Sequence, residues 1–209
     1  MTLEGLDVLL IMPEFSTAPK IAANISTQQV QISEARGIIA YPMDRPLHTI
    51  GMKFKFISKA AAAEFEDFMD AQAGKWKSFY VPSWHAELNP VATLSSGSTS
   101  LQISPVNYAT VYDPTDSNVA RLGHYIFCLH YDGTLFVSKV SSVAGTSPEI
   151  LTLATAAPKD FTLGQFLVGF MYCVNAISDA VDINYFSLNK AEADLGVTET
   201  LKISDGNGS

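Results

Sequence analysis

Apolar and polar residues alternate strictly in the run IGMKFKFI, in the first third of the chain. Met52, Phe54 and Phe56 fall on one side of this run, whereas Lys53 and Lys55 fall on the other. A period of two is typical of a β-strand that buries one face. We therefore predict a strand whose apolar side faces a core and whose lysines are exposed.

A helical period follows the strand in residues 59–73. Residues at i, i+4, i+7 and i+11 share one face of a helix. The positions with this spacing are Ala61, Phe65, Phe68 and Gln72. Ser58 can cap the first turn, and Gly74 stands where a C-terminal cap is expected. The pattern predicts one helix over 59–73, with an apolar face on the preceding strand.

An aromatic segment, KWKSFYVPSWHAEL, comes directly after Gly74. It predicts a short second strand, Ser78 to Val81, which Pro82 closes. Trp and Tyr are enriched both in cores and at protein interfaces. With the two lysines of the first strand, its aromatic residues are our interface candidates: Trp76, Phe79, Tyr80, Trp84, Lys53 and Lys55. Trp84 is the best single anchor of this set.

The amino-acid composition of the chain changes near Asn89, where Ser, Thr and Gly become frequent. Short strand-like runs follow, and Asp132-Gly133 between two of them is a strong hairpin signal. These runs are 99–104, 124–131, 134–140, 149–153, 166–174 and 180–187. We predict a mainly β (α+β) protein in three parts: a sheet or sandwich with the packed helix over 1–90, an antiparallel β-domain, packed on or inserted into the first, over 91–203, and a flexible tail over 204–209.

Composition narrows the class of protein. The chain has 209 residues, a net charge of −8, 47% hydrophobic residues and only 16% charged residues. Net negative charge argues against non-specific duplex binding, and a low charged fraction indicates that neighbours cover part of the surface. The apolar patch LDVLLIM is too short to span a bilayer and follows no basic segment. We expect production in the cytosol and no direct membrane binding.

Histidine and cysteine do not occur at metal-ligand spacings such as CxxC or HExxH. Cys128, His130 and His124 share one strand face, but a zinc site there would need a further ligand from another strand. Cys128 and Cys173 lie in apolar runs, where buried thiols are expected. We therefore predict no metal and no cofactor.

Carboxylates gather on the predicted helix at Glu64, Glu66, Asp67 and Asp70. They lie opposite the phenylalanine stripe, as expected of a solvated face rather than a catalytic dyad. The loop YDPTDSN lacks the glycine and the bidentate glutamate of a calcium loop and reads as a turn. No G-x-S-x-G elbow is present. We predict that the protein is not an enzyme.

The order of helix, Gly-Lys, aromatic strand and YVPSWHAEL resembles the distal tail and tail-tip (baseplate) proteins of long-tailed, siphovirus-like bacteriophages. Those proteins commonly carry F…G….F..P.W..DL after a helix. The matching positions are Phe65, Gly74, Phe79, Pro82, Trp84, Glu87 and Leu88, with Glu87 where aspartate is usual. STSLQI, the GxYIF strand, the Asp-Gly hairpin, VSS, LTLATAAP and AVDINY extend the likeness over most of residues 35–190.

The resemblance implies a ring at the end of the tail tube, built from a tube-like domain in residues 1–90 with an appended β-domain. It implies a sheet that continues between copies, in a hexamer or a trimer. It also implies contact with the tail tube, hub or baseplate and tape-measure proteins, and only transient contact with DNA. The protein would be assembled in the host cytoplasm and reside at the virion tail tip. Some related hubs hold an iron–sulfur cluster, but Cys128 and Cys173 cannot supply four thiolates, which favours the ring protein.

Other interpretations stay open. A trimeric hub protein is one, and a carbohydrate- or receptor-binding β-module that stacks sugars on the aromatic segment or the 105–125 loop is another. A tail-tip hydrolase would need a triad or an acid pair, which we do not find. In the ring interpretation, Lys53 and Lys55 with the acids of 64–70 would contact a neighbour or line the channel. An acidic channel would let DNA pass without sticking.

Overall fold

The computed structural model describes the chain in seven ranges: 2–15, 19–24, 27–31, 38–42, 47–114, 122–187 and 189–200. The predicted tail 204–209 lies outside these ranges. The protein is mainly β, with 47% strand and 10% helix, and it contains a large antiparallel sheet. The predicted mainly β class is confirmed.

The chain divides into two compact units. Unit 1 comprises Met1–Leu10, Ser78–Val174 and Leu201–Ser209, and unit 2 comprises Ile11–Lys77 and Asn175–Thr200. The long middle segment of unit 1 is therefore inserted, in sequence, into unit 2. The boundary predicted near Asn89 falls inside unit 1, because strand β7 (Phe79–Pro82) pairs with strand β12 (Phe166–Ala176) over Met171 to Val174.

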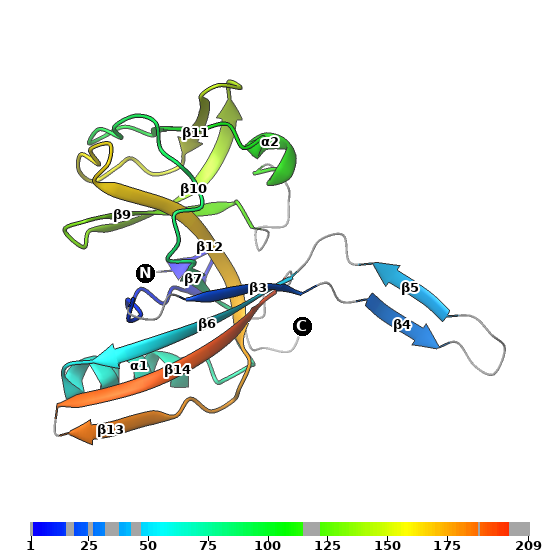
Figure 1. Ribbon diagram of the computed structural model, residues 1–209, viewed down its shortest axis with the longest axis vertical. Coiled ribbons are helices and arrows are strands. Elements are labelled where there is room, and N and C mark those ends of the chain that lie inside the picture. Colours follow the sequence, from blue (N-terminus) through cyan, green and yellow to red (C-terminus); the bar gives the residue numbers. More distant parts are fainter. Residues whose placement is uncertain are drawn as a thin grey trace. The chain divides into compact units, whose positions relative to one another are not determined.

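Unit 2 is built on an antiparallel sheet covered on one face by helix α1 (Lys59–Ala71) (Figure 1). Its strand order is β3 (Lys20–Asn24), β6 (Leu47–Phe56), β14 (Lys190–Glu199) and β13 (Ile183–Ser187). A separate hairpin pairs β4 (Thr27–Gln31) with β5 (Ile38–Pro42). The alternating run of the sequence therefore forms the C-terminal part of β6, which is a strand as predicted.

The core of unit 2 forms between α1 and the apolar side of β6. The ring of Phe65 lies 4.8 Å from that of Phe54 and 5.3 Å from that of Phe56, measured between centroids. Alanines on β14 leave room for these rings, since Ala193 stands opposite Phe54 and Ala191 opposite Phe56. Small residues facing large ones allow the close packing that is typical of protein interiors.

Helix α1 begins as predicted and ends two residues earlier. The Ser58 hydroxyl accepts the backbone N–H of Ala61 at 3.2 Å, which caps the first turn. The buried face of the helix is Ala62, Phe65 and Met69, continued by buried Gln72. Phe68 and Ala61 are only half-buried. The predicted apolar face was therefore wrong at these two positions, because the helix face that contacts the sheet is rotated by about one residue.

Within unit 1, strand β12 pairs with β9 and β7, and the antiparallel strand order continues from β9 through β10 and β11 to β8 (Figure 1). The remaining elements of unit 1 are β1 (Thr2–Leu3), β2 (Leu6–Asp7), β8 (Ser100–Ile103), α2 (Tyr108–Val111), β9 (Tyr125–His130), β10 (Leu135–Ala144) and β11 (Glu149–Leu153). All the strands predicted over residues 99–174 are present, and the hairpin at Asp132-Gly133 is confirmed.

Candidate functional site

The sheet of unit 2 ends in two short strands of equal length, β3 and β13. Among the strands that the structure describes, β3 pairs only with β6 and β13 only with β14. Strand β13 exposes two large apolar side chains, Tyr185 (51%) and Phe186 (54%). They line a groove of about 580 Å³ against Lys59 and Ala63 of α1. A sheet edge with exposed aromatic side chains is a site where another strand can add.

The sheet face opposite α1 carries glycines and charged residues. Gly51 stands opposite Gly196, and Lys53 opposite Asp194. The Nζ of Lys53 lies 3.6 Å from a carboxylate oxygen of Glu192. The face is open at Gly51, where an added side chain would meet no atom within 4 Å, whereas a Cβ at Gly196 would lie 3.2 Å from the side chain of Ile177.

Lys55, the second lysine of the candidate set, also lies on this face. Its Nζ is 3.1 Å from Glu14 and 3.9 Å from Glu192. The sequence hypothesis instead grouped the lysines with the acids of α1. Within unit 2 those acids lie on the far side of the sheet, because α1 packs on the phenylalanine face and the lysines point from the other face.

The aromatic candidates separate into exposed and buried residues. Trp76 belongs to unit 2 and is 63% exposed. Phe79, Tyr80 and Trp84 belong to unit 1 and are buried in it, Trp84 being only 5% exposed. These three side chains are therefore core residues of the single chain, and Trp76 is the aromatic candidate that a partner can reach.

Residues 82–88 form a tight corner against β12. Trp84 adopts a left-handed backbone conformation with φ of +59°, and its ring lies 6.0 Å from that of Phe127. The carbonyl of His85 approaches Gly169 so closely that a Cβ there would lie 2.3 Å from its oxygen. Only glycine permits this approach of two backbones.

Glu87 organises this corner from within. Its carboxylate accepts the Ser83 hydroxyl at 2.6 Å, the backbone N–H of Phe170 at 2.7 Å and the Tyr172 hydroxyl at 3.3 Å. Burial raises the pKa of the Glu87 carboxyl, and these hydrogen bonds oppose that rise. The glutamate in the phage-like motif is thus a structural hydrogen-bond acceptor.

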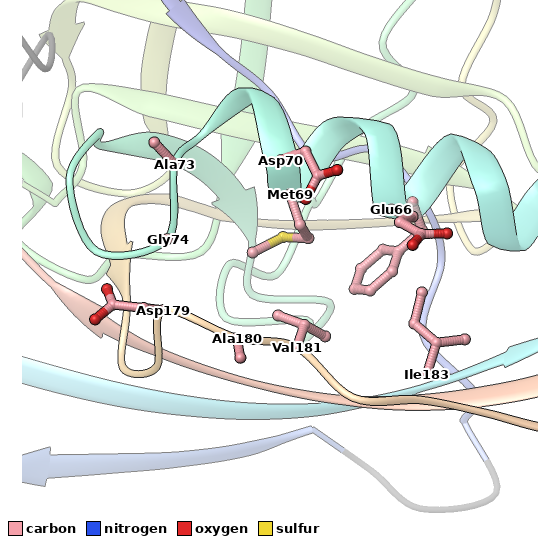
Figure 2. A pocket seen from close by; sticks show the side chains of 10 residues that line it. Glu66, Met69, Asp70, Ala73, Gly74, Asp179, Ala180, Val181 and Ile183 are labelled. Carbon is pink, nitrogen blue, oxygen red and sulfur yellow. The ribbon is translucent and has the colours of Figure 1, made fainter.

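A pocket of about 350 Å³ opens in unit 2 between α1 and the segment that precedes β13. Figure 2 shows Met69 pointing from the helix toward Val181 of that segment. Glu66 and Asp70 line the helix side, and Asp179 lies at the far end. The pocket thus combines an apolar floor with three carboxylates.

At one end of this pocket, the backbone of Gly74 lies against Asp179, and only glycine leaves room for this contact. The φ of Gly74 is +66°, and a Cβ there would lie 2.7 Å from the Cα of Asp179. The carboxylate of Asp179 accepts the backbone N–H of Lys75 at 3.1 Å, and the Lys75 ammonium lies 3.9 Å away from it. The Gly-Lys pair that ends the helix therefore fixes the following loop to residues near 179.

Histidine and cysteine do not gather into a site. No group of three His, Cys, Asp or Glu side chains able to hold a metal occurs among the described residues. Burial raises the pKa of the Cys128 thiol to about 12, so it stays protonated at neutral pH. Cys173 is likewise a buried thiol. His130 lies 2.9 Å from Asp132, which also pairs with Lys159 at the hairpin turn.

Two candidate loops are only partly described. Residues 115–121, which include most of YDPTDSN, lie outside the described ranges, as does part of the 105–125 loop. In the described part, buried Glu149 accepts the backbone N–H groups of Val106 and Tyr108 at 2.9 and 3.0 Å. These contacts give that carboxylate a structural role.

The sequence interpretation missed two strands of the site, β3 and the longer strand β14. The buried positions of β14 include Ala191, Ala193 and Leu195, and polar residues alternate with them. The signal was the same period of two that revealed β6. Alanines on the apolar side made it weak, since alanine is depleted in strands.

Neither a comparison with protein-family models nor one with curated proteins finds a match to this chain. Within the described ranges, no helix has the length and apolar character needed to cross a bilayer.

Proposed function

We propose that this chain is a structural protein of a bacteriophage tail tip. It forms a ring that joins the tail tube to the baseplate or hub and surrounds the DNA channel. Support comes from the resemblance of most of residues 35–190 to distal tail proteins and from the two outer strands of the sheet in unit 2. It performs no catalysis and needs no cofactor in this role.

The observation that carries the proposal is the geometry of those outer strands. Neighbouring strands in the order β3–β6–β14–β13 are antiparallel, so β13 runs opposite to β3. Rotation about a ring axis preserves strand direction relative to that axis. The β13 strand of one copy therefore meets the β3 strand of the next in antiparallel orientation. Antiparallel pairing of these two outer strands would let the sheet continue from copy to copy and would cover the β3 and β13 edges.

The apolar side chains at these edges match this arrangement. Ile183 and Tyr185 stand opposite Ala193 and Ala191, so they share the α1 side of the sheet. On β3, Ile21 stands opposite buried Ile50 and has the same side. Pairing the two edges would bring Tyr185 beside Ile21 of the next copy, which would cover apolar surface that is exposed in the single chain.

The face opposite α1 would line the channel. Lys53 and Lys55 are paired there with Glu192 and Glu14, and Asp194 lies beside them. The mixed charge revises the hypothesis of an acidic channel. Lysines engaged by carboxylates offer little net attraction to phosphate, so DNA would pass without being held.

The partners in this proposal are further copies of the chain, the tail tube protein, and the hub, baseplate and tape-measure proteins. A hexamer is the expected ring, with a trimer as the alternative. The protein resides in the virion at the tail tip after assembly in the host cytoplasm. Its contact with DNA is transient.

Matched substitutions test the edge-pairing model. Tyr185→Lys places a charge on β13, whereas Tyr131→Lys makes the same change at another exposed tyrosine (75%) in unit 1. A hot-spot contact is worth about 2 kcal/mol, so Tyr185→Lys should raise the concentration needed for assembly more than tenfold. Sedimentation velocity measures this. Equal assembly of both variants would contradict pairing through β13.

A carbohydrate-binding module is the second candidate, favoured by Tyr131. This side chain borders a shallow pocket of about 300 Å³ in unit 1, lined also by Asn89 and Leu163. An exposed aromatic ring beside an amide is a common sugar platform. Saturation-transfer NMR with bacterial surface polysaccharide would show transfer that Tyr131→Ala abolishes if this candidate holds.

A further inference from the structure

We infer that the pocket between α1 and residues 179–183 receives a lysine or arginine side chain of a partner protein. The pocket lies wholly within unit 2, on the side of the sheet that α1 covers. It is separate from the charged face assigned above to the channel. The inference is independent of the ring, because the pocket is complete in one chain.

The floor of the pocket suits the aliphatic stem of such a side chain. Phe65 and Met69, both buried, line it from α1. Val181 and Ile183 line it from the opposite segment (Figure 2). Lysine and arginine bury their methylene stems on apolar surface while their charged ends stay at the rim. The volume of about 350 Å³ accommodates one long side chain but no secondary-structure element.

The rim supplies the matching charge. Glu66 and Asp70 are the acidic side chains that α1 contributes to the pocket lining (Figure 2). Within the part of the chain that the structure describes, neither carboxylate forms an ion pair, whereas Asp179 is already engaged by Lys75. A cation with its stem on Met69 would lie within reach of both helix acids.

The position of Asp70 on the helix adds a physical reason. It lies in the last turn of α1, and that turn holds no basic residue. A negative side chain near the C-terminal carbonyls opposes the helix macrodipole. A bound cation would relieve that repulsion, so docking would remove an unfavourable interaction as well as add favourable ones.

Trp76 extends the same surface. Its backbone N–H bonds to the carbonyl of Ala73, a lining residue, at 3.3 Å, and its side chain is 63% exposed. Tryptophan is the aromatic residue that binds cations best and is enriched among interface anchors. The combination favours a basic protein segment over a bare metal ion, because apolar side chains form the floor and cannot coordinate a metal.

A matched peptide pair tests the inference. One fluorescein-labelled peptide alternates arginine with leucine, and the other replaces each arginine by neutral citrulline. Fluorescence anisotropy measures binding to the full chain, to Glu66→Gln/Asp70→Asn and to Glu64→Gln/Asp67→Asn. The last variant makes the same change in net charge on the same helix, outside the pocket lining.

The expected result is binding of the arginine peptide only. Loss of the pocket acids should weaken it at least about tenfold, and the control variant should change it less than about twofold. Equal weakening in both variants would mean non-specific charge attraction and would overturn the inference. Equal binding of the two peptides, or no binding of either, would overturn it as well.

Two further measurements distinguish a partner protein from other ligands that could occupy the pocket. Spermidine that displaces the peptide at the peptide's own affinity would identify a free polyamine as the ligand and overturn the assignment to a protein. Loss of peptide binding when the chain self-associates, measured by sedimentation of the same samples, would identify a second copy. Binding that persists in both arms supports a different basic partner.

Discussion

The carboxylate of Glu87 accepts the backbone N–H of Phe170 at 2.7 Å and so ties residues 82–88 to the centre of β12. The contact joins positions 83 residues apart in the chain. It also explains the acid of the phage-like motif physically. A hydrogen-bond acceptor of this reach is needed where the corner interrupts regular strand pairing between Pro82 and Leu88.

Glu87→Ala should destabilise unit 1. The substitution leaves the Phe170 N–H and two hydroxyl groups without their acceptor, at a cost of about 2 to 3 kcal/mol. Urea unfolding followed by tryptophan fluorescence measures the change. Glu64→Ala, on the exposed face of α1, is the control and should change stability by less than about 0.5 kcal/mol. A Glu87→Ala protein as stable as the control would contradict the structural role.

The ionisation of Glu87 should make a measurable contribution to the pH dependence of stability. Burial raises its pKa above the value in the unfolded chain. Its contribution to stability is therefore fully present below the unfolded pKa of about 4.3 and declines as the pH rises through the raised pKa. Glu87→Gln cannot ionise, so the difference in unfolding free energy between wild type and variant should shift in favour of the variant from pH 4 upward. A difference that is constant with pH would contradict the assignment.

Gly169→Ala tests the close approach of the corner to β12. A Cβ there would lie 2.3 Å from the His85 carbonyl oxygen and 2.7 Å from the Phe127 ring. We expect a loss of about 2 kcal/mol or more, because backbone must move. Gly51→Ala is the matched control, since its Cβ would meet nothing within 4 Å. Thermal unfolding should show a lowered Tm only for Gly169→Ala, and equal Tm values would contradict the packing described.

Replacement of the two tryptophans should affect the stability of the protein to very different extents. Trp84→Ala removes a buried side chain and should cost about 3 to 5 kcal/mol of stability. Trp76→Ala changes an exposed side chain and should cost less than about 1 kcal/mol. Urea unfolding of the isolated chains separates the two effects. A Trp84→Ala protein of wild-type stability would restore Trp84 as an interface anchor and contradict its place in the core.

Local periodicity explains what could be predicted from the sequence. The first turn of α1 and the apolar side of β6 follow from Ser58 and from Phe54 and Phe56, because neighbouring residues determine them. The burial of Trp84 and the exposure of Trp76 could not be predicted, because the same residue type serves both roles. The pocket was also beyond sequence reasoning, since it depends on Gly74 meeting Asp179, over a hundred positions away.

The most direct test of the proposed ring is the mass of the purified protein in solution, with negative-stain images of the same sample. We predict six copies, or three in the trimeric alternative, around an open centre, either alone or after addition of tail tube protein as a template. A chain that stays monomeric in both conditions would contradict the ring.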